Sequence, residues 1–598
     1  MYGRLWLLGC AFGVVAVSGS AAVSAGAAAA PQQTVQRVTL VGSARLPTAG
    51  LSAAVTHAGG AVPARRMPTT KRLGAAVSPP AASTSVPGSP IVGGQLPGFA
   101  GFRGLTHLDQ RNAGTGVYAN TQFSLEPPDQ ALCVGGGFVL EGVNEAFRVF
   151  TTGGNAVTQP ISYSQFFGLP PEVVRSNPPT FGPFLSDPKC YFDPATHRWF
   201  MTQLEFGQDQ LTGAFGPPSD LLVAVSKTSD PRGAWWLYKV VTTDDGTSGT
   251  PVHSGCPCFG DQPLIGADKN GFYVSTNEYG ITSTAYHGSQ LYAFSKSGLE
   301  TGANGNVVHI DAAPMTTSIP NGGLAVSVQP ATSPTPQWVS ANNGTAYFAS
   351  VTDWSVGPAL GQGANRILAW ALTNTGSLNT ASPAVHLAFK VIPSEFYTQP
   401  PNATQKPGPR PLGTSLGNPL ELIATNDDRT NQVVFANGKL WTGVNTSVTQ
   451  GGGAPRSGIA FFVVRPSVAS GFTATMAAQG YLSARGAHIY YPSIGVTAGG
   501  KAVMAFSLSG PHFFPSAAYA PLRHGHAGPI YIAGRGKLPE DGFTGYKAEG
   551  GNGVARWGDY SAAVADPNGR IWMAAEYIPR APRTPLANWG TFVWHVHP

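Results

Sequence analysis

Acidic residues recur at similar places along this sequence, close to short apolar segments. Aspartates precede several of these segments, and glutamates end others, next to an aromatic or a small residue. The acids that together form a candidate ligand-binding face are Asp129, Asp187, Asp261, Asp427, Asp559, Glu278 and Glu576. Carboxylates that converge can coordinate calcium, or can act as a general acid and base. Calcium is therefore the one cofactor considered, and no catalytic residue is assigned.

A structural role for these acids is the competing interpretation. Residues at equivalent places in a repeat usually make the same hydrogen bond each time, and a carboxylate can cap exposed strand amides. We favour this role over metal binding, and metal binding over catalysis. The sequence contains no His-Glu-x-x-His helix and no Walker loop.

Cysteines offer a second kind of chemistry. Apart from Cys10, the sequence contains Cys133, Cys190, Cys256 and Cys258. An even number of cysteines in an exported chain predicts disulfides, and three pairings are possible. The alternative is a metal site at Cys256-Pro257-Cys258. The disulfides are favoured, because this spacing is not the usual zinc spacing and no His/Cys pair follows at zinc-finger distance.

Short strands joined by tight turns must position these residues. The sequence has 76 Gly and 52 Pro, and both residues favour turns and disfavour helix interiors. Turn signals such as Asp268-Lys269-Asn270-Gly271, Asn437-Gly438 and Asp566-Pro567-Asn568-Gly569 separate apolar runs in the manner of β-hairpins. A third strand, and in some units a fourth, follows each hairpin. The pattern predicts an all-β fold, a β-propeller of about seven blades of three- to four-stranded antiparallel sheets.

The ends of the repeat region carry two further predictions. Phe592 to Val596 form a final strand, so the last blade is expected to take its outer strand from the segment near Phe102 to Leu108. The extra length of each unit is predicted to lie in loops between the second and third strands. Such loops on a rigid scaffold would supply binding specificity.

Three regions divide the chain. Residues 1–29 have the basic start, the short apolar stretch and the small residues of a signal peptide. Residues 30–96 are rich in Ala, Pro, Ser and Thr and are predicted to be a disordered linker. Residues 97–598 are predicted to be the propeller. No later stretch is apolar enough for a membrane span, and a thinly spread charge of +6 disfavours nucleic acid.

Three phrases resemble a group of uncharacterised secreted bacterial proteins with a sialidase-like or related β-propeller fold. They are Glu126-Pro127-Pro128-Asp129-Gln130, Thr228-Ser229-Asp230-Pro231-Arg232-Gly233-Ala234-Trp235 and Arg556-Trp557-Gly558-Asp559-Tyr560-Ser561. The resemblance begins near Gly98 and implies the fold and export, but it assigns no activity and no catalytic residue.

These features predict a secreted protein of the extracellular space or cell envelope that binds a glycan or an extracellular protein. The alternative is a secreted glycoside hydrolase or lyase, similar to sialidases, that uses carboxylates at the central channel. The oligomeric state is not predicted.

Overall fold

The repeating unit of the fold is an antiparallel sheet of four strands. It is seen in a computed structural model, which describes residues 31–46, 82–283, 285–320, 323–334, 337–352, 363–523 and 525–598. The four-strand runs, each given from its inner to its outer strand, are β5 (Ala131–Gly135), β6 (Phe138–Val143), β7 (Ala146–Thr151) and β8 (Ile161–Ser162); β11 (Phe184–Asp193), β12 (Arg198–Gln208), β13 (Phe215–Ser226) and β14 (Ala234–Val241); β15 (Cys258–Ala267), β16 (Gly271–Gly280), β17 (Tyr286–Ser295) and β18 (Gly305–Asp311); β19 (Val326–Thr332), β20 (Thr345–Val351), β21 (Ala364–Thr373) and β22 (His386–Tyr397); β24 (Val433–Ala436), β25 (Lys439–Thr449), β26 (Arg456–Ser467) and β27 (Thr473–Leu482); β28 (His488–Val496), β29 (Ala502–Gly510), β30 (Phe513–Arg523) and β32 (Ile530–Gly534); and β34 (Ala562–Ala565), β35 (Ile571–Tyr577), β36 (Gly590–Val596) and β4 (Ala100–Thr106).

Shorter elements lie outside these four-strand runs, and three of the short strands pair with strands of the sheets. The shorter elements are β2 (Thr84–Ser85), β3 (Ile91–Val92), β9 (Val173–Val174), β10 (Thr180–Phe181), β23 (Leu422–Ile423), β31 (His526–Ala527), β33 (Val554–Ala555), and the helices α1 (His107–Arg111), α2 (Tyr163–Phe167), α3 (Lys296–Thr301) and α4 (Pro411–Ser415). None of the helices in the described ranges is long and apolar enough to cross a membrane.

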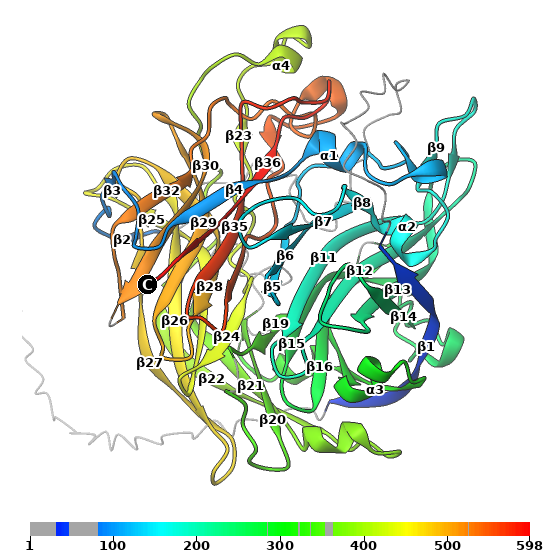
Figure 1. Ribbon diagram of the computed structural model, residues 1–598. Coiled ribbons are helices and arrows are strands. Elements are labelled where there is room, and N and C mark those ends of the chain that lie inside the picture. The colour runs from blue at the N-terminus through cyan, green and yellow to red at the C-terminus, as the bar shows by residue number, and fades with distance from the viewer. Residues whose placement is uncertain are drawn as a thin grey trace, which may run out of the picture.

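The sheets are arranged around a common centre in a β-propeller-like ring. Each of the inner strands β5, β11, β15, β19, β24, β28 and β34 contacts the next, and β34 contacts β5. Figure 1 shows the sheets from β11 to β18 on one side of the molecule and those from β24 to β32 on the other, with β5 and β19 between them.

Apolar side chains fill the spaces between neighbouring sheets. Every residue of β16 and β29 is buried, because each of these strands has a sheet packed on both faces. Phe200 of β12 and Phe272 of β16 stack across one such space, with their ring centroids 4.9 Å apart. This packing explains why many strands read as continuous apolar runs rather than alternating ones.

The predicted closing strand is confirmed. β4 supplies the outer strand of the last sheet and pairs antiparallel with β36, so that Ala100 lies opposite His595 and Phe102 opposite Val593. The ring is therefore held together by strands from distant parts of the sequence.

The predicted linker is wrong for Gln32–Arg45, which form the strand β1, and for Thr84–Ser85 and Ile91–Val92, which form β2 and β3 and pair with β25 and β32. β1 pairs with the outer strands β14 and β18 and joins two neighbouring sheets into one sheet of nine strands. Thr34, Gln36 and Val38 are more buried than the residues between them, which are exposed. This alternation is expected of an outer strand with one face toward the protein and the other toward solvent. The predicted signal peptide and residues 47–81 of the linker lie outside the described residues.

The longest connections run between sheets, so the prediction of long loops between second and third strands is wrong. Residues 209–214 suffice to join β12 to β13, and residues 450–455 join β25 to β26. Much longer segments, such as residues 398–432 and 535–561, connect one sheet to the next. Second and third strands are hydrogen-bonded neighbours, so that a tight turn is enough to join them.

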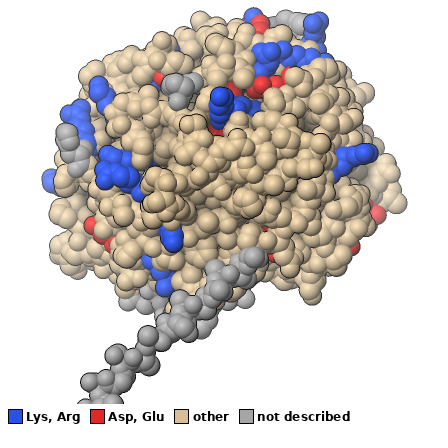
Figure 2. All heavy atoms as spheres, turned by 90° about the horizontal axis from the view of Figure 1, so that it is seen from below, with Lys and Arg blue, Asp and Glu red and all other residues tan. Residues whose placement is uncertain are grey.

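On the face in Figure 2, charged side chains form small groups separated by uncharged surface.

Candidate functional site

Most inner strands, or the segments just before them, contain one residue in the left-handed backbone region. Asp187 in β11, Gln262 in β15, Ser327 in β19 and Tyr491 in β28 have φ between +45° and +58°, and the pairing register shifts beside each of them. Asp129, just before β5, has φ +48°. For residues other than glycine this region costs about 1–2 kcal/mol. Such bulges re-aim side chains, and here they do so near the centre of the ring.

Asparagines from the preceding sheet hold three of these strained residues. In each case the Asn Oδ1 accepts the backbone N–H of the left-handed residue. The contacts are Asn144 with Asp187 at 2.9 Å, Asn277 with Ser327 at 2.9 Å and Asn445 with Tyr491 at 2.7 Å. The repeated structural hydrogen bond expected from the sequence therefore belongs to asparagines, one of which, Asn277, directly precedes the candidate acid Glu278.

Three of the predicted aspartates meet at the centre of the ring. Asp129, Asp187 and Asp559 are buried and offer carboxylate oxygens within 4.8 Å of one another. The Asp559 N–H donates to Asp129 Oδ1 at 2.5 Å, and the Tyr560 hydroxyl donates to Asp187 Oδ1 at 3.3 Å. Asn144 Nδ2 donates to Asp129 Oδ2 at 3.0 Å. Hydrogen bonds therefore orient all three of these acids.

Two cations lie beside these aspartates. Lys189 Nζ is 2.7 Å from the centroid of the Tyr560 ring, and Arg556 Nη2 is 3.6 Å from Asp559 Oδ2. Burial lowers the pKa of Lys189 well below its ordinary value, against the opposing effect of Asp187 and Asp129. The three carboxylates could supply oxygens to a calcium ion. Arg556 already supplies a positive charge beside Asp559, and calcium binding stays a prediction.

Asp261 and Asp427 belong to the same central network through Arg429. The single Nε–H of Arg429 is shared between the two carboxylate oxygens of Asp427, each 2.8 Å from Nε, and Nη1 donates to Gln262 Oε1 at 3.0 Å. Gln262 Nε2 in turn donates to Asp559 Oδ2 at 3.2 Å. Burial disfavours the charge of Arg429, but Asp427 and then the other neighbouring anionic groups, Asp261 included, outweigh it and raise the Arg429 pKa.

Glu576 adjoins this network, and Glu278 does not. Glu576 Oε2 accepts the Gly558 N–H at 2.8 Å, and burial raises the pKa of Glu576 well above its ordinary value, with a contribution from Asp129. The structure thus brings six of the seven predicted acids together, and the seventh lies in a separate cluster. Whether they form a ligand-binding face stays a prediction.

A cavity of about 500 Å³ occupies the centre of the ring. Residues of all the inner strands named above line it. Gln130, Lys189 and Ser561 belong both to the cavity wall and to the segments that carry the central acids, whereas Asp129, Asp187 and Asp559 are not in the wall. At the other end the wall includes the exposed turn residues Gly499 and Asn568. The cavity therefore opens on the side of the turns between first and second strands.

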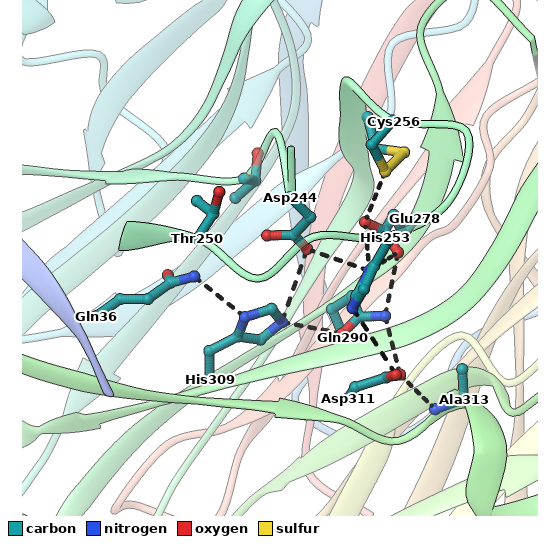
Figure 3. A network of polar contacts seen from close by, with 12 residues as sticks. Gln36, Asp244, Thr250, His253, Cys256, Glu278, Gln290, His309, Asp311 and Ala313 are labelled. Carbon is teal, nitrogen blue, oxygen red and sulfur yellow. Dashed lines mark hydrogen bonds and ion pairs between the residues drawn. A yellow bond between two sulfur atoms is a disulfide. The ribbon is translucent and has the colours of Figure 1, made fainter. Parts of the chain in front are cut away.

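Glu278 belongs to a second polar cluster, near the C-terminal end of β16 (Figure 3). His253 Nδ1 donates to Glu278 Oε2 at 2.8 Å, and His253 Nε2 lies 3.9 Å from Asp311 Oδ2. Gln290 Nε2 donates to Glu278 Oε2 at 3.2 Å and to Asp311 Oδ1 at 3.1 Å. Burial lowers the pKa of His253, but the hydrogen bond and charge of Glu278 outweigh it, so that the net shift is upward.

A second imidazole and a third carboxylate complete this cluster. Gln36 Nε2 donates to His309 Nδ1 at 3.2 Å, and His309 Nε2 donates to Gln290 Oε1 at 2.9 Å, which fixes a neutral ring. Burial, and then the charge of His253, lowers the pKa of His309 to about 3. Asp244 Oδ2 lies 3.8 Å from both imidazoles, and burial followed by the Glu278 charge raises the pKa of Asp244 to about 10.

The glutamates that end second strands do not share one role. Glu145 lies against Glu172, Glu205 against Lys239, Glu278 against His253, and Glu576 against the Gly558 amide. The expectation of one repeated contact therefore fails for these glutamates. Their neighbours come from connections that differ between sheets, and this difference explains the diversity.

The predicted disulfides are confirmed, and the structure selects one of the three pairings. Cys133 of β5 is joined to Cys190 of β11, and Cys256 is joined to Cys258. The first bond links the inner strands of neighbouring sheets. The second closes a three-residue ring, and Cys256 Sγ lies 3.5 Å from Glu278 Oε1, at the edge of the second cluster.

Several residues of both clusters escaped the sequence analysis. Lys189 follows Asp187 by two positions. The sequence signal that could have placed it is the recurrent proline at Pro188, Pro263 and Pro492, each of which follows a left-handed residue. Arg429 and His253 lie in long connections outside the repeat, where no pattern identifies them.

Comparisons with known proteins give structural similarities only. No protein-family model and no curated protein sequence matches the chain. A protein of unknown function from Dyadobacter fermentans is 11% identical, with a TM-score of 0.33 over 69% of this chain and 94% of that one. The hemagglutinin-neuraminidase ectodomain of parainfluenza virus 5 is 9% identical, with a TM-score of 0.32 over 69% and 80%. The endosialidase of phage phi92 is 8% identical, with a TM-score of 0.29 over 68% and 66%.

Proposed function

We propose that the protein is a secreted seven-bladed β-propeller that binds a hydroxyl-rich, sugar-sized ligand in its central cavity. The observation that carries this proposal is the cavity of about 500 Å³ lined by residues of every inner strand. Its volume falls within the range of ~300–1,000 Å³ typical of small-molecule sites. The cavity opens beside exposed turns, so a ligand can reach it from solvent.

The chemistry of the cavity wall supports a ligand with many hydroxyl groups. β5, β11, β15, β28 and β34 are edge strands of their sheets, so backbone N–H and C=O groups line the channel without a strand partner. Thr332, Ser333 and Thr497 add hydroxyl-bearing side chains to the cavity wall. Groups that both donate and accept suit sugar hydroxyls, and Tyr191 and Phe192 add apolar surface for a sugar ring.

The test is binding of the purified full chain to an array of neutral and carboxylated glycans, scored for retained protein and for trimmed sugar. Lys189→Met removes the one amine near the closed end of the cavity and is expected to weaken binding of a retained glycan at least tenfold. Lys390→Met, at an exposed position of β22, is the matched control and should leave binding unchanged. Equal binding by both variants, or no retained glycan, would contradict the proposal.

A glycoside hydrolase is the weaker alternative. The oxygens of Asp129, Asp187 and Asp559 lie within 4.8 Å, close enough for a carboxylate pair to cooperate. These acids are not in the cavity wall, however, and a catalytic acid must reach the sugar oxygen. Trimmed glycan that disappears in Asp187→Asn would favour the hydrolase over the binding module.

A further inference from the structure

Two groups of potential metal ligands share Cys256. The first consists of Cys256, Cys258 and His287, and the second of His253, Cys256 and Glu278. Within each group the ligand atoms lie within 4.8 Å of one another. This proximity is invisible in the sequence, because the β16–β17 hairpin brings His287 back to the cysteines.

The backbone beside the cysteines makes room for His287. Gly255 has φ +92°, and a Cβ added there would lie 3.3 Å from His287 Cε1 and 3.5 Å from its Nε2. His287 Nε2 is shielded from solvent and has no hydrogen-bond partner among the described residues. An imidazole nitrogen without a hydrogen-bond partner, beside two sulfurs, is the arrangement expected of a metal ligand in a metal-free site.

We infer that Cys256, Cys258 and His287 bind a zinc ion when the disulfide between the two cysteines is reduced. Thiolate sulfur and imidazole nitrogen are the ligands that Zn²⁺ prefers in tetrahedral sites. Cys256 is shared with the second group, so the fourth position lies on the side of His253 and Glu278. The inference concerns the second cluster and does not rest on the function of the central cavity.

The charges around the cysteines favour thiols over free thiolates, and a zinc complex over both. Glu278 Oε1 lies 3.5 Å from Cys256 Sγ, and Asp244 and Asp311 lie around the same His253. Neighbouring carboxylates disfavour a bare thiolate, whereas a divalent cation is stabilised by them. Zinc binding is therefore expected to displace both thiol protons at the moment of coordination.

The switch consists of two balanced steps. A small-molecule thiol reduces the disulfide: two R–SH give two electrons and two protons, the S–S bond breaks, and R–S–S–R leaves with two Cys–SH on the protein. Zn²⁺ then binds both sulfurs and releases two protons to solvent. Reoxidation of the thiols by a disulfide of the same class expels the ion.

Reduction of this disulfide is compatible with the folded state. A disulfide stabilises a protein mainly by closing a loop, and the bond Cys256–Cys258 spans a sequence separation of only 2, against 57 for Cys133–Cys190. The chain-entropy relation therefore assigns much less stabilisation to the short loop than to the long one.

The experiment uses the full chain, stripped of metal with a chelator and divided into an oxidised and a dithiothreitol-treated sample under nitrogen. Cys256 and Cys258 are checked by alkylation and mass spectrometry, and folding by circular dichroism. The reduced chain is expected to bind one equivalent of Zn²⁺ and to show a thiolate-to-cobalt absorption band with Co²⁺. The oxidised chain should bind at least tenfold more weakly.

Variants locate the ion. Cys256→Ser/Cys258→Ser is expected to abolish the cobalt band, and His287→Ala to weaken Zn²⁺ binding at least tenfold. His512→Ala, which removes an exposed histidine, is the matched control and should bind as the unaltered chain does. Equal Zn²⁺ binding by the oxidised and reduced chains, or Zn²⁺ binding by His287→Ala as tight as that of the unaltered chain, would each overturn the inference.

Discussion

The two polar clusters of this protein differ in how far their groups are satisfied. In the central network, Asp427 is paired with Arg429, Asp559 receives two amides and a guanidinium, and Asp129 accepts two hydrogen bonds. In the second cluster, three carboxylates surround His253, whose Nε2 has no hydrogen-bond partner among the described residues. The central acids thus have partners that hold them in place, whereas the second cluster keeps ligand atoms without a hydrogen-bond partner among the described residues, such as His253 Nε2 and both oxygens of Asp244.

The largest effect is expected from breaking the central network. Arg429→Met leaves Asp427 buried without its partner and should lower the free energy of unfolding by about 3–5 kcal/mol. Arg232→Met is the control, because the pair Arg232–Asp230 is exposed and such pairs contribute about 0–1 kcal/mol. Denaturant unfolding followed by circular dichroism measures both. Similar losses in the two variants would remove the distinction between a structural centre and an ordinary surface.

A smaller effect is expected from removing one of the repeated asparagines. Asn445→Ala deprives the Tyr491 N–H of its acceptor and two buried carbonyl groups of their donor, which should cost about 2–3 kcal/mol. Asn155→Ala, at an exposed position, should change stability by less than about 0.5 kcal/mol. Thermal unfolding of the two variants gives the comparison. An Asn445→Ala variant as stable as Asn155→Ala would show that these asparagines do not hold the ring.

The smallest expected effect is the change in unfolding free energy with pH that His309 of the second cluster causes. The pKa of His309 is lowered to about 3 in the folded state, below its unfolded value of 6.5. The stability it contributes is therefore complete above pH 6.5 and is lost as the pH falls toward 3. Relative to His309→Gln, the unaltered chain should lose about 2 kcal/mol between pH 6.5 and 5. Urea unfolding at the two pH values tests this.

His253 gives a contrast of opposite sign. Its folded pKa is raised, so its stabilisation is present below pH 6.5 and is lost as the pH rises through the folded pKa. The difference in unfolding free energy between the unaltered chain and His253→Asn should therefore shrink with rising pH. A difference that does not change with pH would show that Glu278 and His253 are not charge partners.

The sequence predicted the parts of the molecule that repeat. Hairpin turns such as Asn437-Gly438 follow from local turn chemistry, and the closing strand near Phe102 follows from the strand pattern of the repeat. Nothing local identifies β1, whose partners β14 and β18 lie far away in the sequence. His253, His287 and Arg429 were missed for the same reason, because their roles arise only from long-range packing.

The pairing of β4 with β36 has a consequence for how the chain is made. Ala100 lies opposite His595, so the first and last strands of the ring meet only after nearly the whole sequence has left the ribosome. Until then the edge of β4 has no partner, and the chain cannot complete its most non-local contacts. The ring can therefore close only when β36 is available to pair with β4.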